Sequence, residues 1–182
     1  RDLHSFPTRR SSDLAKLKLD EESWSLECTV VAHLAEVWDQ PDHGIWERRG
    51  APRHYVFSKV MCWVAFDRAI KSAERFGFKA PLVKWRVLRE AIHRDVCRRG
   101  FDPDLNSFVE SYGSKLLDAS LLLLPSVGFL PPDDPRVRAT VLAIADELTE
   151  NELVLRYRVE ETDDGFVLRL RPLLPVEEWN AQ

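Results

Sequence analysis

Hydrophobic side chains recur at three- and four-residue spacings over much of this chain, the pattern typical of amphipathic α-helices. Three clear stripes predict helices over residues 24–38, 57–76 and 81–99. The side chains expected to face inward from these helices are Leu26, Val30, Val31, Leu34, Val37, Trp38, Val60, Trp63, Phe66, Ile70, Ala73, Leu82, Trp85, Leu88, Ile92 and Val96.

Glycine, proline and aspartate mark where the predicted helices begin and end. Gly77 and Gly100 are suited to close the second and third helices. A fourth helix is expected over about residues 115–124, and a fifth over about residues 135–148 with Asp134 as its N-cap. Because the connections are short, successive helices are expected to form antiparallel hairpins, so the fold class is predicted to be all-α.

After residue 152 the pattern changes from helical to alternating. The segments LVLRYRVE (153–160) and FVLRLR (166–171) alternate apolar and polar side chains. The Asp164-Gly165 pair between them is a good hairpin turn. A short β-hairpin is therefore expected near the C-terminus.

The helical period breaks between residues 39 and 52, and Glu47 lies in this break, between Trp46 and the two arginines Arg48 and Arg49. Spacing alone favours a solvated loop in which Glu47 pairs with Arg49. Asp42, in the sequence Pro-Asp-His-Gly, is expected to accept hydrogen bonds from the amides of a turn.

A longer stretch around this glutamate, DHGIWERRGAPRHYVFSKVM, resembles the motif of glycoside hydrolase family 15, the glucoamylase, trehalase and glucodextranase group. Further matches are KWRVLREAIHRDVCRRGFDP, YGSKLLDASLLLLPSVGFLPPDDPRVRATV and LTENELVLRYRVEETDDG. The resemblance covers about residues 14–165, and its segments occur in the family's order.

The resemblance implies that the helices are part of an (α/α)6 barrel, a toroid with its active-site loops at one rim. It also implies an inverting glycoside hydrolase that acts on α-linked glucose in maltooligosaccharides or trehalose, without a cofactor or a metal ion. Such enzymes use a general acid and a general base roughly 6.5–9.5 Å apart.

The family's general acid falls on Glu47, and partial burial against Trp46 would raise the pKa of its carboxyl. Trp46 is suited to a wall against a pyranose ring or to a plug at the barrel rim. The neighbouring arginines are suited to sugar hydroxyls or to anchoring the loop, and His54 and Lys59 to holding the loop or touching substrate. The candidate substrate-binding residues are thus Trp46, Arg48, Arg49, His54 and Lys59.

The second carboxylate is not evident. Family members place a Gly-rich, Glu-containing stretch after the TDDG turn, whereas this chain reads FVLRLRPLLPVEEWNAQ. The nearby acids are expected to belong to a solvated turn: Glu160, Glu161, Asp163 and Asp164. The chain is thus expected to carry the acid, to lack the base and to be inactive alone. The alternative function is a non-catalytic helical toroid or repeat segment that acts as an interaction scaffold.

Three regions are expected along the chain. Residues 1–14 have no apolar period, and HSFPTRRSSDL looks like a translated sequencing adapter, so they are expected to be a non-native or disordered arm. Residues 15–165 are expected to be the partial catalytic domain, and residues 166–182 a divergent tail.

Composition excludes several classes of protein. The formal charge of -4, with basic residues interspersed among acids, gives no reason to expect nucleic acid as a partner. Cys28, Cys62 and Cys97 lie in apolar helical patterns without metal-ligand spacing, so buried reduced thiols and a cytoplasmic location are expected. The pattern specifies no oligomeric state.

Asp118 is a carboxylate within the apolar run LLDASLLLLP. Because an unpaired carboxylate would be costly there, it is expected to pair with a Lys or Arg or to cap a neighbouring backbone segment. This run is the best candidate for a membrane span and is shorter than the roughly 20 residues required, so no membrane association is expected.

Overall fold

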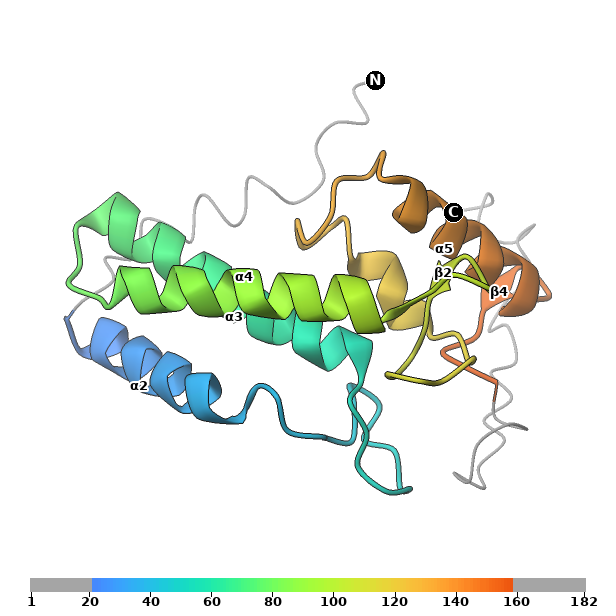
Figure 1. Cartoon of the computed structure of the whole chain (residues 1–182), viewed down its shortest axis with the longest axis horizontal. Helices are drawn as coiled ribbons and strands as arrows, with labels where there is room; N and C mark the ends of the chain where they lie inside the picture. The colour runs from blue at the N-terminus through green and yellow to red at the C-terminus, as the bar shows by residue number, and fades with distance from the viewer. Residues whose placement is uncertain (1–20, 159–182) are drawn as a thin grey trace, which may run out of the picture.

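The computed structural model describes residues 21–158, which are mostly helical (Figure 1). The helices are α2 (Glu21–Val37), α3 (Val56–Phe76), α4 (Leu82–Arg99), the 3-10 helix η1 (Ala119–Leu123) and α5 (Pro135–Glu147). Two antiparallel strand pairs accompany them, formed by β1 (Phe101–Asp102) with β2 (Ser107–Phe108) and by β3 (Thr149–Glu150) with β4 (Leu153–Val154).

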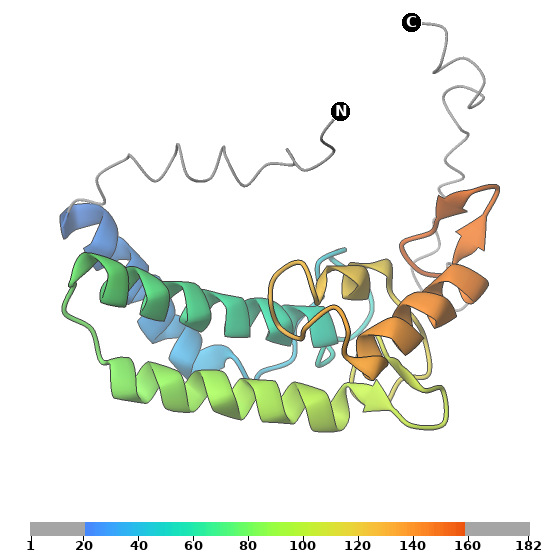
Figure 2. The same ribbon diagram turned by 90° about the horizontal axis from the view of Figure 1, so that it is seen from above.

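Helices α3 and α4 form the central antiparallel hairpin, and the two views show them side by side along most of their length (Figures 1 and 2). Gly77 ends α3 in the left-handed conformation, at a φ of 70°, and donates its N–H to the Ala73 carbonyl. This conformation carries no Cβ penalty for glycine, so the chain can turn back into α4 within a few residues.

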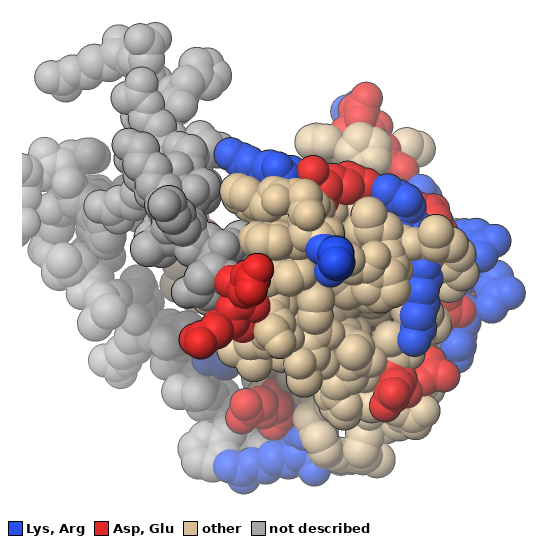
Figure 3. Space-filling model, turned by 90° about the vertical axis from the view of Figure 1, so that its left-hand side faces the viewer, with Lys and Arg blue, Asp and Glu red and all other residues tan. Residues whose placement is uncertain are grey.

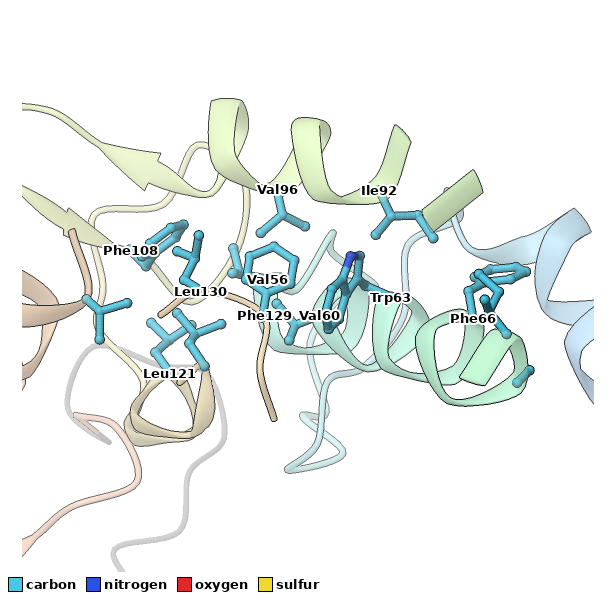
Figure 4. Packing of buried hydrophobic residues seen from close by; sticks show 14 of the residues in the cluster. Val56, Val60, Trp63, Phe66, Ile92, Val96, Phe108, Leu121, Phe129 and Leu130 are labelled. Carbon is cyan, nitrogen blue, oxygen red and sulfur yellow. The ribbon is translucent and has the colours of Figure 1, made fainter. Parts of the chain in front are cut away.

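The apolar stripe of α3 faces α4 as the sequence predicts. Val60, Trp63, Phe66, Ile70 and Ala73 are all buried. From α4, Trp85, Ile92 and Val96 are buried against them, whereas Leu82 and Leu88 are partly buried. Figure 4 shows the labelled side chains of the two helices pointing toward one another.

Helix α2 begins and ends close to the predicted bounds, and its apolar stripe is in part the predicted one. Of the predicted stripe, Val31 is buried, and Leu34 and Trp38 are partly buried against the core. Trp24 and Val31 are buried, and Trp24 stacks on Phe78 at a centroid distance of 4.9 Å. Leu26 and Val30, which were expected to face inward, are 66% and 57% exposed. Within residues 21–158, only one face of α2 is covered by α3 and the α3–α4 turn.

Of the segment predicted as a helix over residues 115–124, residues 115–118 are not helical, and residues 119–123 form the 3-10 helix η1. Asp118 has φ -142° and ψ 129°, and its side chain accepts a hydrogen bond from the Ser120 amide. An aspartate in this state is an N-cap, which starts a helix after itself rather than continuing one. The prediction failed because the local capping bond outweighed the apolar pattern.

Helix α5 begins where the sequence indicates. Asp134 caps it by accepting from the Arg136 amide at 2.9 Å, and Pro135 occupies the first turn. Val137, Thr140 and Ile144 are buried, and α5 packs against η1 and β2.

The predicted C-terminal hairpin is only partly within the described residues. Leu153–Val154 does form a strand, but it pairs with Thr149–Glu150 through a turn at Asn151 and Glu152, which both have positive φ. The predicted turn at residues 164–165, the residues 1–14 and the tail 166–182 lie outside the described residues.

Several apolar side chains remain exposed on the helical hairpin. Val83 and Val87 lie one turn apart on α4 and are 75% and 62% exposed. Figure 3 views the end of the molecule where α2 begins and where α3 turns into α4, and it shows uncharged surface with basic and acidic side chains set among it. No helix among residues 21–158 is both long and apolar enough to cross a membrane.

Candidate active site

The connection between α2 and α3, residues 38–55, carries Glu47 and is called the acid loop below. Its two arms are joined by a β-bridge in which Asp42 and Arg53 exchange backbone hydrogen bonds of 2.8 Å. Glu47 lies between these arms, exposed, with its backbone at a φ of 50°. The structure thus places Glu47 in a loop at helix ends, as the sequence predicts.

Asp42 fixes the first turn of the acid loop. Its Oδ1 accepts from the Gly44 amide at 2.6 Å and from the Ser58 hydroxyl at 2.7 Å. This confirms the prediction that Asp42 bonds to turn amides.

Lys59 lies beneath the same turn and is 2% exposed. Its Nζ donates to the Gln40 carbonyl and lies 3.8 Å from Asp42 Oδ2. Burial lowers the pKa of the Lys59 ammonium, and Asp42 opposes that shift. These contacts fit the expectation that Lys59 holds the acid loop.

Arg48 turns into the protein rather than toward solvent. Its Nη2 donates to Glu110 Oε2 at 2.6 Å, and both side chains are almost fully buried. Its guanidinium also lies 3.6 Å from the centre of the Tyr157 ring. Of the two roles expected for this arginine, the structure supports anchoring of the loop.

Glu110, the partner of Arg48, is a buried carboxylate that the sequence did not single out. Burial raises its pKa above the ordinary value, while Arg48 and Arg53 oppose the shift. Arg53 Nη1 lies 3.4 Å from Oε1, which also accepts from Ser114 at 3.3 Å. Because its oxygens are occupied and the side chain is inaccessible to solvent, Glu110 is poorly placed to activate a water molecule.

Trp46 is held by a second buried carboxylate. Its indole Nε1 donates to Oδ1 and Oδ2 of Asp118 at 3.1 and 3.0 Å. Asp118 also caps η1, which confirms the expectation that it caps backbone. The guanidinium of Arg156 lies 5.1 Å from the centre of the Trp46 ring, so an exposed cation borders the candidate site.

The remaining predicted site residues lie around the loop in different ways. The His54 ring stacks on Tyr112 at 5.8 Å, and the His54 carbonyl accepts from the Tyr112 amide at 3.0 Å. Arg49 is exposed, two residues after Glu47 in the loop. His54 therefore lies at the exit of the loop, where a structural role fits its contacts.

Neither the proposed general acid nor the candidates for the second carboxylate are buried groups within the described residues. Glu47 was expected to be partly buried against Trp46, yet it is exposed among the described residues. The acids considered as the second carboxylate, residues 160–164, lie outside the described part. Within residues 21–158, no group of three or more His, Cys, Asp or Glu side chains is arranged to hold a metal ion.

The three cysteines are free thiols, each of intermediate exposure rather than fully buried as expected. Burial is nevertheless the main cause that raises the pKa of the Cys62 and Cys97 thiols. Their raised pKa disfavours the reactive thiolate at neutral pH.

Known structures share this fold. A glycosidase variant in complex with glucose superimposes with a TM-score of 0.62 at 23% identity, covering 70% of this chain and 33% of that one. A wild-type glycosidase gives a TM-score of 0.60 over the same shares. The prediction of a partial helical glycosidase toroid is therefore confirmed.

Sequence relatives are trehalases. The chain is 53% identical over 149 residues to a trehalase from Mycobacterium tuberculosis, an overlap of 82% of this chain and 22% of the relative. It is 45% identical over 151 residues to a trehalase from Thermoplasma acidophilum, covering 81% of this chain and 26% of that protein. The chain thus spans about a quarter or less of the length of these relatives.

The family match extends over nearly the whole chain. The model for Glycosyl hydrolases family 15 matches residues 3–181, which include the segment around Glu47 and the anchors of the acid loop. By this match and by the identity to the trehalases, the chain belongs to glycosyl hydrolase family 15.

Proposed function

We propose that this chain is the part of an inverting α-glucoside hydrolase, of the trehalase type, that carries the general acid Glu47. The observation that carries the proposal is the arrangement of the acid loop. Trp46 and Arg48, on either side of Glu47, bind Asp118 and Glu110, while Glu47 itself is exposed. Trehalose is the favoured substrate because the curated relatives described above are trehalases.

The reaction assigned to Glu47 is protonation of the glycosidic oxygen as the bond to the anomeric carbon breaks. A second carboxylate takes a proton from water, and the resulting hydroxide attacks the opposite face of the sugar. In the residues described, Glu47 is solvent-exposed, so the bound sugar and the rest of the enzyme are proposed to enclose it during the reaction.

The five neighbouring candidates divide into two roles in this proposal. Trp46 offers an aromatic face to a pyranose ring, and Arg49 is exposed for sugar hydroxyls. Arg48, His54 and Lys59 hold the loop through their contacts with Glu110, Tyr112 and Gln40. The 182-residue chain alone is proposed to be inactive, because no base has been assigned in it. A cytoplasmic location is proposed from its free thiols.

The test is Glu47→Gln in the full-length protein that contains this segment. Turnover of trehalose should fall about 10²–10⁴-fold, the scale of a lost general acid, because the amide cannot protonate the leaving oxygen. Glucose release from trehalose, maltose, maltotriose and isomaltose would be measured in parallel to identify the substrate. Glu36→Gln, an exposed glutamate on α2, is the matched control and should leave turnover unchanged.

Near-normal turnover of Glu47→Gln would remove this residue from the mechanism. If the protein hydrolyses maltooligosaccharides but not trehalose, Glu47 stays the proposed general acid, and the proposed substrate becomes a maltooligosaccharide.

A further inference from the structure

We infer that Glu110 and Asp118 are positioning residues that clamp the acid loop on both sides of Glu47 and thereby fix the backbone from which its carboxyl group projects. The inference rests on the proposed role of Glu47 as general acid. It goes beyond that role, because it assigns a catalytic purpose to two buried carboxylates that do not reach the substrate.

The first arm of the clamp acts on the residue before Glu47. Trp46 donates its one indole N–H to both oxygens of Asp118, which is 4% exposed. The Asp118 carboxylate is itself fixed by the Ser120 amide at 2.7 Å. A charged acceptor of this kind makes a stronger bond than a neutral one, so the Trp46 ring is held in one orientation.

The second arm acts on the residue after Glu47. Arg48 is bound to Glu110 at 2.6 Å in a site from which solvent is excluded, because the two side chains are 7% and 0% exposed. The Glu110 backbone is fixed as well, since its carbonyl accepts from the Val56 amide at 2.8 Å, at the start of α3.

Both carboxylates come from one segment, residues 110–118, which runs beside the exit of the acid loop. The Tyr55–Ser111 bridge and the bond from the Tyr112 amide to the His54 carbonyl hold this segment against the loop. Glu47 therefore lies between two fixed neighbours, with its own backbone held at a positive φ of 50°. A displacement of about 1 Å at a reacting group can cost on the order of 10²-fold in rate.

The experiment compares turnover by the full-length protein with single changes in each arm. Asp118→Asn and Trp46→Phe weaken or remove the first bond, and Glu110→Gln removes the charge from the second. Each should lower kcat for trehalose about 10–100-fold, by misplacing the acid. The double variant Trp46→Phe/Asp118→Asn should lose no more than the worse single variant, because both changes break the same contact.

A variant that only destabilises the fold is the necessary control. Asp67→Asn removes another buried carboxylate, which lies on α3 and binds Arg68, Lys71 and Arg89 on the helical hairpin rather than residues of the acid loop. It should lower the melting temperature without lowering kcat at a temperature where the protein stays folded. If Glu110→Gln does not fold, Trp46→Phe still tests the clamp, because it alters one donor and keeps an aromatic ring.

The decisive measurement repeats the clamp variants in the Glu47→Gln background. If the clamp acts through the acid, Asp118→Asn should cause no further fall in the residual rate there. An equal fall in both backgrounds would overturn the clamp and leave the role of Glu47 intact, and so would a kcat loss in Asp67→Asn as large as in Asp118→Asn. If Glu47→Gln alone has no effect, the proposed general acid fails, and the clamp fails with it.

Discussion

At the scale of single residues, the backbone of Glu47 is unusual. A non-glycine residue with φ near 50° lies in the left-handed region, which costs an L-residue roughly 1–2 kcal/mol because its Cβ approaches the carbonyl oxygen. Unfavourable backbone conformations of this kind concentrate at functional sites, where surrounding contacts enforce them. Here those contacts are the bonds of Trp46 and Arg48.

This conformation makes a prediction about stability. Glu47→Gly should be more stable than Glu47→Ala by about 1 kcal/mol, because glycine has no Cβ to strain at positive φ. This ranking of the two variants is informative, because at an unstrained backbone position alanine is more stabilising than glycine by about 0.4–1 kcal/mol. Urea unfolding of both variants would measure the difference. An alanine variant equal to or more stable than glycine would show that the backbone at residue 47 is not strained.

The same scale explains which site residues the sequence could reveal. Glu47 and Trp46 stand in a local motif, and Asp42 in a local turn, so short stretches suffice to find them. Glu110 pairs with Arg48 at a distance of 62 residues along the chain, and nothing in its own neighbourhood marks it as buried. Pairing of this kind depends on tertiary packing, which spacing does not encode.

At the scale of elements, the success of each helix prediction depends on how much of the helix surface is covered and on which residue caps its start. The stripe of α3 predicted its bounds within one residue, because that helix is packed along most of its length. The stripe of α2 was right for Val31, Leu34 and Trp38 and wrong for Leu26 and Val30, because this helix has two apolar faces and the described residues cover one of them. At η1 a single capping aspartate outweighed a run of leucines.

The cap of α5 provides a prediction with a defined pH dependence. Asp134→Ala should destabilise the protein by about 1 kcal/mol at pH 7, because the Arg136 amide loses its acceptor. Asp134→Asn, which keeps an acceptor oxygen, should lose less. Thermal unfolding of the three proteins would measure both differences.

The sign of the pH effect follows from the pKa of Asp134. Hydrogen bonds from Arg136 hold that pKa below its ordinary value of 3.8. The stabilisation from the charged form is therefore fully present above pH 3.8 and is lost as the pH falls through the lowered pKa. The difference in stability between the parent protein and Asp134→Ala should therefore become smaller at acid pH. A gap that stays constant down to pH 2 would exclude the ionic contribution.

At the scale of the whole molecule, the exposed apolar side chains set the behaviour in solution. Val83 and Val87 of α4 and, separately, Leu26 and Val30 of α2 are exposed apolar side chains. Exposed apolar surface favours association. The isolated 182-residue chain is therefore expected to self-associate.

Replacing Val83 and Val87 together with threonine tests this expectation. Threonine has nearly the shape of valine but adds a hydroxyl, so the double variant should associate less at the same concentration. Sedimentation equilibrium over a range of concentrations would compare the two chains. Association that high salt abolishes would point to charge pairing instead.

The bonds from Trp46 to Asp118 and from Arg48 to Glu110 also affect the order in which parts of the protein fold. Helices α2, α3 and the start of α4 can pack as soon as they leave the ribosome, because they are neighbours in sequence. Glu47 is made before most of them, yet the partners of Trp46 and Arg48 are 72 and 62 residues further along. Closing so long a separation is favourable only once the helices between have packed. Glu47 is therefore synthesised well before the residues that hold its two neighbours, so the acid loop reaches its final shape only after Asp118 has emerged from the ribosome.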